Sequence, residues 1–90
     1  MKKAIITVIG KDKVGIIAGV TKTLSECKVN VLDITQTILQ DMFTMMMIVD
    51  ISGSHMAISE VGSELNKTGD ELGVEIRIQH EEIFNSMHRI

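Results

Sequence analysis

The chain has 90 residues, which is enough for one hydrophobic core and too few for two independently folding domains. Its hydrophobic fraction of 44% and charged fraction of 23% exclude the composition of a disordered chain. The net charge of −3 offers no excess of cations to a nucleic-acid backbone. No apolar run reaches the ~18 residues of a membrane-spanning helix, so we expect no membrane partner and no direct nucleic-acid partner. The single cysteine suits a reducing compartment, so we expect a cytoplasmic protein.

The N-terminal part of the chain predicts a buried strand followed by an amphipathic helix. Residues 4–9 form a β-branched run that Gly10 closes, which is typical of a central strand. Residues 11–15 then indicate a turn. The apolar residues that follow recur at helical spacing and predict one buried helix face, made of Ile17, Val20, Leu24 and Cys27.

Two strands are predicted next in the chain. Residues 31–39 are rich in β-branched residues, but their apolar positions change parity, so either both faces are covered or a bulge interrupts the alternation. Residues 43–51 mix polar and apolar side chains on one parity, which indicates a face only partly covered within one chain. The other parity is wholly apolar and indicates a face on the core, made of Phe43, Met45, Met47, Val49 and Ile51.

The C-terminal part predicts a second helix, a last strand and a short tail. Ser54 is a plausible cap for an amphipathic helix, and Gly73 is a typical helix stop. One face of this helix carries Ile58, Val61, Leu65 and Leu72. Apolar and polar residues alternate over residues 74–79, which predicts a strand with one buried face and one solvent-exposed face. The acidic start and basic end of residues 81–88 favour a short helix.

The predicted order is βαββαβ, which places this chain in the α+β class. Two right-handed crossovers with a hairpin between them give the ferredoxin-like fold, a four-stranded antiparallel sheet with both helices on one face. We therefore expect one domain over residues 1–80 and a short C-terminal helical tail over 81–90. The second sheet face stays open and carries side chains such as Met46 and Ile48. A second chain or the tail helix would cover it.

The loop from Gly10 to Ile17 is the sharpest local feature. It resembles half of a phosphate-binding loop, but Ile16 and Ile17 stand where that motif needs a cation and a hydroxyl. Backbone N–H groups at a helix start can still hold a small anion such as a carboxylate. The same residues also fit a plain turn that Gly10 and Gly15 allow and Asp12 caps, and spacing alone favours the turn.

The remaining reactive residues form no catalytic or metal-binding pattern. The single cysteine, Cys27, lies in register with the apolar stripe of the first helix, where a thiol acts as a small buried hydrophobe. The histidines at 55, 80 and 88 stand apart and have no second cysteine at ligand spacing. Met45 and Met47 share the apolar strand parity, so we interpret them as core residues. We predict no catalytic residue, no metal and no cofactor.

The motifs in residues 4–50 together resemble the ACT domain family, in particular its small stand-alone members related to glycine cleavage system transcriptional regulators. Each motif is weakly specific by itself, and the resemblance rests on their combined spacing. The matching residues are Gly10-Lys11-Asp12 and Gly15-Ile16 in the first loop, Asn30-Val31-Leu32-Asp33-Ile34 in the second strand and Phe43-Thr44-Met45 in the third.

The resemblance implies a regulatory, non-enzymatic module that binds an amino acid between two copies of the domain. In the family, the first loop faces the ligand together with the start of the second strand, often from the neighbouring copy. We therefore expect a homodimer that acts on a regulated enzyme or a transcriptional regulator. The expected ligand residues are Gly10, Asp12, Lys13, Val14, Gly15, Ile16, Asn30 and Val31.

Three other functions are compatible with this fold class. A ligand-free interaction or scaffold module is the main alternative. An acylphosphatase would need an arginine in or just after the first loop, whereas the arginines here are Arg77 and Arg89. An RNA-recognition motif would need stacking aromatic side chains on its central strands, and Phe43 alone cannot supply them.

Overall fold

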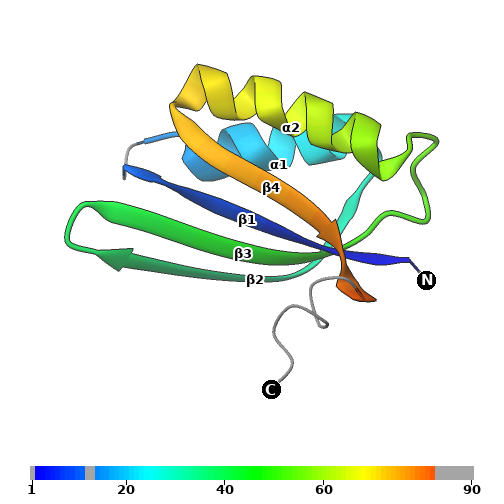
Figure 1. Cartoon of the computed structure of the whole chain (residues 1–90), viewed down its shortest axis with the longest axis horizontal. Coiled ribbons are helices and arrows are strands. Elements are labelled where there is room, and N and C mark those ends of the chain that lie inside the picture. Colours follow the sequence, from blue (N-terminus) through cyan, green and yellow to red (C-terminus); the bar gives the residue numbers. More distant parts are fainter. Residues whose placement is uncertain (1, 12–13, 83–90) are drawn as a thin grey trace.

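The computed structural model describes residues 2–11 and 14–82. The strands are in the order β2-β3-β1-β4 and each neighbouring pair is antiparallel. Both helices lie on one side of this sheet (Figure 1), so the ferredoxin-like βαββαβ prediction is confirmed. The elements are β1 (Lys3–Lys11), α1 (Ile16–Glu26), β2 (Asn30–Leu39), β3 (Met42–Asp50), α2 (Ile58–Leu72) and β4 (Val74–His80).

The structure describes only the start of the predicted C-terminal helix. Of the helix predicted over 81–88, only Glu81 and Glu82 are described, and both are helical. The other positions of that helix lie outside the described residues, so the division into a domain and a tail stays a prediction.

In the described ranges, no helix is long and apolar enough to cross a membrane.

One apolar core fills the space between the sheet and the helices. The wholly apolar parity of β3 and the residue after it point into this core, with exposures from 0% to 7%, as predicted. Met45 and Met47 are completely buried there. The helices contribute Val20 and Leu24 from α1, and Val61 and Leu65 from α2.

The predicted inner face of α1 is wrong at one position. Ile17 is 39% exposed, whereas the preceding residue, Ile16, is 2% exposed and belongs to the core. Successive helical residues are rotated by about 100°, so only one of two adjacent isoleucines can face inward. The series Ile16, Val20, Leu24 and Cys27 lies on the buried side.

β2 is an edge strand with a bulge near its start. The pairing with β3 shifts register between Val31 and Asp33, which explains the change of parity in the sequence. Beyond the bulge, β2 side chains are exposed on both faces, including Ile34 at 42% and Ile38 at 53%.

The start of α2 differs from the prediction. The Ser54 hydroxyl does not cap the helix; it accepts the Met56 N–H at 3.1 Å in a local turn. The N-cap is Ala57, whose N–H donates to Glu60 Oε1 at 2.9 Å. At the other end, Gly73 terminates α2 with φ 73°, as predicted.

Candidate functional site

The expected ligand residues lie at opposite ends of the sheet within one chain. Gly10 pairs with Phe43 where β1 ends, while Asn30 pairs with Asp50, which pairs with Lys3 where β1 begins. The span of β1 is about 26 Å at ~3.3 Å per residue. In Figure 1, the end of β1 and the start of β2 are accordingly far apart. One small ligand cannot touch both groups in the same chain.

The first half-site is the start of α1. Gly15 precedes the helix with φ 95°, and its carbonyl accepts the Gly19 N–H at 2.9 Å. The first N–H groups of a helix have no intrahelical acceptor, and no described side chain caps them here. These amides and the positive end of the helix dipole favour an anion. Val14 beside them is 99% exposed.

Three of the expected ligand residues in this loop offer no described side chain to a ligand. The Ile16 side chain is buried in the core, so only its backbone could meet a ligand. Asp12 and Lys13 lie outside the described residues.

Gly10 has a packing role in the structure. A Cβ at this position would come within 2.6 Å of Val74 Cγ1, so the lack of a side chain lets β4 approach β1. The sequence alone indicated only a turn at this glycine, because the contact with Val74 joins two distant parts of the chain.

The second half-site is a hollow of about 600 Å³ beside the C-terminal end of α1. Asn30 is exposed and Val31 is half-buried. Among the described residues, none hydrogen-bonds to the Asn30 amide, which is free to donate and to accept. The hollow is lined by Thr21, Leu24, Ser25, Lys28, Val29, Asn30, Val31 and Gly53.

A tight turn between α1 and β2 positions this second half-site. Lys28 has φ 62°, its N–H donates to Ser25 O at 3.1 Å, and the Val29 N–H donates to Leu24 O at 2.9 Å. The turn directs the chain from α1 straight into β2, which places Asn30 next to the hollow. Asn30 and Val31 both line this hollow, and their role as ligand residues stays a prediction.

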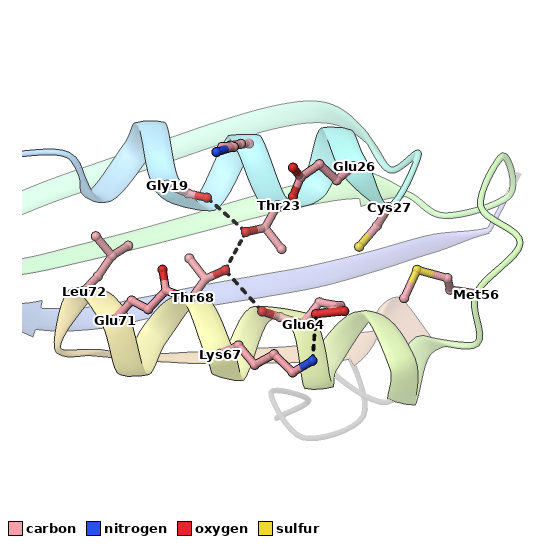
Figure 2. A pocket seen from close by; sticks show the side chains of 11 residues that line it. Gly19, Thr23, Glu26, Cys27, Met56, Glu64, Lys67, Thr68, Glu71 and Leu72 are labelled. Carbon is pink, nitrogen blue, oxygen red and sulfur yellow. Dashed lines mark hydrogen bonds and ion pairs between the residues drawn. The ribbon is translucent and has the colours of Figure 1, made fainter.

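A second hollow, which the sequence did not indicate, lies between α1 and α2 (Figure 2). Its volume is about 510 Å³. Two threonine hydroxyls meet on its floor, with Thr23 Oγ1 2.5 Å from Thr68 Oγ1. Charged side chains surround them: Lys22 and Glu26 from α1, and Glu64, Lys67 and Glu71 from α2.

Cys27 lines the hollow between α1 and α2 and is 5% exposed, so its predicted burial is confirmed. Burial raises the pKa of the Cys27 thiol, and the nearby carboxylates of Glu64 and Glu26 raise it further. A raised pKa keeps the thiol protonated and a poor nucleophile.

The described residues contain no group of three or more His, Cys, Asp or Glu side chains that could hold a metal ion. The pKa of the Asp50 carboxyl group is lowered by hydrogen bonds from the Ser52 hydroxyl and the Ser52 N–H. Those bonds close the turn after β3. They hold a turn in place and form no catalytic pair.

Comparison with known proteins agrees with this architecture. An ACT domain model matches residues 2–79. A UPF0237 protein from Clostridium acetobutylicum is 60% identical over 88 residues, which cover 98% of this chain and 99% of the relative. The solved structure of an ACT domain protein from Streptococcus pneumoniae is 44% identical, with a TM-score of 0.81 over 92% of this chain and 93% of that one.

A more distant structure shares the fold. It is that of a candidate glycine cleavage system transcriptional repressor, which is 23% identical with a TM-score of 0.76. The match covers 88% of this chain and 45% of that one. Since the family model spans nearly the whole chain and the Clostridium relative matches along its full length, this chain is a member of the ACT domain family.

Proposed function

We propose that this chain is a regulatory domain that binds an amino acid between the two copies of a homodimer. ACT domains are in general regulatory modules that bind small molecules such as amino acids. The observation that carries the proposal is the separation of the two half-sites, one at each end of the sheet. Each half-site is open, and each is incomplete by itself.

A symmetric dimer would join the two halves. β2 is an edge strand, with one side free for a partner. If β2 pairs antiparallel with β2 of a second copy, the two-fold axis brings the α1 start of one copy towards Asn30 of the other. Exposed apolar side chains support contact on this side, namely Ile17 of α1 with Ile34 and Ile38 of β2.

The chemistry of the two halves suits an amino acid. The uncapped amides at the start of α1 would receive its carboxylate. The Asn30 amide of the other copy can accept from the ammonium group or donate to the carboxylate. The output of such a sensor would be a contact with a regulated enzyme or a transcriptional regulator.

A thermal-shift screen with the twenty amino acids tests ligand binding. A ligand at 100 times its dissociation constant should stabilise the dimer by about 2.7 kcal/mol. Stabilisation by a subset of amino acids is the expected result. If no amino acid stabilises the protein, the ligand proposal fails and the ligand-free scaffold module becomes the better explanation.

Mixing two variants tests whether the site is shared between copies. Gly15→Ala and Asn30→Ala should each lose binding of the amino acid found in the screen. In a 1:1 mixture, calorimetry should recover about one quarter of the wild-type sites, because half of randomly paired dimers are mixed and each has one intact site of two. A site within one chain predicts no recovery. Full binding by both single variants would refute the site.

A further inference from the structure

The hollow at the start of β2 has a single charged side chain in its lining, that of Lys28. Every other residue that lines this hollow is uncharged. Lys28 is exposed, and its ammonium group forms no ion pair with any other described residue. The hollow therefore offers an unpaired positive charge to whatever lies in it.

Two acidic residues in the adjoining elements have other surroundings. Asp50, which pairs with Asn30 across the sheet, accepts hydrogen bonds from the hydroxyl and the N–H of Ser52. Glu26 of α1 lines the other hollow, between α1 and α2. Neither carboxylate lines the hollow beside Lys28, so the Lys28 charge stays available to a ligand.

The C-terminal end of α1 also leaves the Lys28 side chain free. The last carbonyl groups of a helix lack intrahelical donors and usually favour a cation. Here three of the last four, those of residues 23–25, each accept an N–H group from residues 27–29 at 2.9–3.1 Å. Backbone donors thus satisfy this end of the helix, and the ammonium group of Lys28 is not needed there.

Two neutral donors accompany Lys28 in the hollow. Within the described residues, neither the Ser25 hydroxyl nor the Asn30 amide forms a hydrogen bond, and both can donate. The Thr21 hydroxyl already donates to Ile17 O at 2.8 Å. A cation with free N–H and O–H donors beside it is a set that suits a carboxylate, because hydrogen bonds to an ionised acceptor are the stronger ones.

Lys28 also lies close to the proposed position of the ligand. In the proposed dimer, the amino acid has its α-carboxylate at the α1 start of one copy and its main-chain ammonium group near Asn30 of the other. Lys28 precedes Asn30 by two residues, so their Cα atoms are at most ~7 Å apart. The side chain of a ligand held at Asn30 is therefore within reach of the flexible Lys28 side chain.

We propose that the ligand is an acidic amino acid, aspartate or glutamate, and that Lys28 selects it by binding its side-chain carboxylate. This inference rests on the proposed function, because it assigns the side chain of the same ligand. A neutral ligand side chain leaves the Lys28 charge unpaired, and a basic one is repelled by it. An acidic side chain pairs with Lys28 and accepts from the Ser25 hydroxyl.

Ligands of equal shape and different charge test the selection. In calorimetry with the wild-type protein, glutamate or aspartate should bind about tenfold more tightly than its own amide, glutamine or asparagine, because the amide loses the charge-assisted hydrogen bonds. Lys28→Gln should abolish this difference. Lys22→Gln is the matched control and should keep the difference, since Lys22 belongs to α1 but lines the other hollow.

A charge reversal gives a second measurement that loss of the fold cannot imitate. Lys28→Glu should bind lysine or arginine more tightly than glutamate. If the wild type binds a neutral amino acid and does not favour the acids over their amides, the role of Lys28 is refuted while the proposed function stands. An unchanged preference in Lys28→Gln would refute it equally. If none of the twenty amino acids binds, both proposals fail.

Discussion

Gly15 and Gly73 share a backbone conformation that residues with a side chain rarely adopt. Their φ angles are 95° and 73°. Gly15 precedes α1, and Gly73 follows α2. At Gly15 the constraint is conformational and not steric, since an added Cβ would meet no atom within 4 Å. Open space around a strained position is what a ligand-facing loop requires.

Alanine at either glycine should destabilise the fold to a similar degree. A left-handed backbone costs a residue with a Cβ about 1–2 kcal/mol, which urea unfolding of Gly15→Ala and Gly73→Ala will measure. Only Gly15→Ala should also lose amino-acid binding, because Gly73 is outside the proposed site. Equal loss of binding in both variants would show that strain in the fold, and not the site, controls affinity.

Cys27 should react slowly with thiol reagents in the folded protein. Its pKa is raised above the ordinary value of 9.0 by burial, with Glu64 and Glu26 adding to the effect. Folding therefore favours the protonated thiol, and this contribution to stability is lost as the pH rises above about 9. Labelling at pH 8 should follow unfolding, with urea-unfolded chain as the fast control. Rapid labelling of the native protein would contradict this.

The contact between α1 and α2 includes the hydroxyl groups of Thr23 and Thr68, which have two protons for three possible hydrogen bonds. Thr23 is placed to donate to Gly19 O and Thr68 to Glu64 O, both at 3.1 Å, and the two hydroxyls also touch each other. Each hydroxyl has one proton. At any moment only two of the three hydrogen bonds can form, so removing one hydroxyl leaves no buried donor unpaired.

A double-mutant cycle measures the link between the helices. Thr23→Val and Thr68→Val should each cost less than about 1.5 kcal/mol of unfolding free energy, and their coupling should be about 0.5–1.5 kcal/mol. Thr21→Val is the matched control, since the Thr21 hydroxyl bonds only to carbonyls of its own helix. A cycle of Thr21 with Thr68 should show no coupling. Equal coupling in both cycles would refute the interhelical bond.

The same elements show what local sequence can and cannot predict. The inward face of β3 was predictable because one parity is wholly apolar. The choice between Ile16 and Ile17 was not, since both are apolar and helical periodicity tolerates either. Ser54 satisfied the rule for a cap but made a shorter turn, because Glu60 could serve Ala57 instead.

The candidate site was predictable as two sets of residues but not as one place. The crossover through α1 decides that Gly10 and Asn30 lie at opposite ends of the sheet, because α1 runs back along the sheet and β2 begins at the end where β1 begins. This distance depends on how segments far apart in the chain are arranged, and the apolar periodicity within one segment does not report it. The hollow between α1 and α2 was missed for the same reason, as its residues come from both helices.

At the scale of the whole molecule, the two exposed apolar surfaces have different roles in the proposals above. The side of β2 that carries Ile34 and Ile38 is the proposed contact with a second copy. The face of the sheet opposite the helices, which carries Ile9 and Met46, is not part of that contact. A charge introduced on one surface should therefore change the oligomeric state, and a charge introduced on the other should not.

Ile38→Lys and Ile9→Lys form a matched pair for this test, because their exposures are 53% and 46%. Sedimentation of the wild type should give about twice the chain mass of 9.9 kDa. Ile38→Lys should give the single-chain mass, because like charges would meet across the two-fold axis at the edge of β2. Ile9→Lys should stay dimeric. A stable wild-type monomer, or dissociation only in Ile9→Lys, would remove β2 as the interface and with it the shared ligand site.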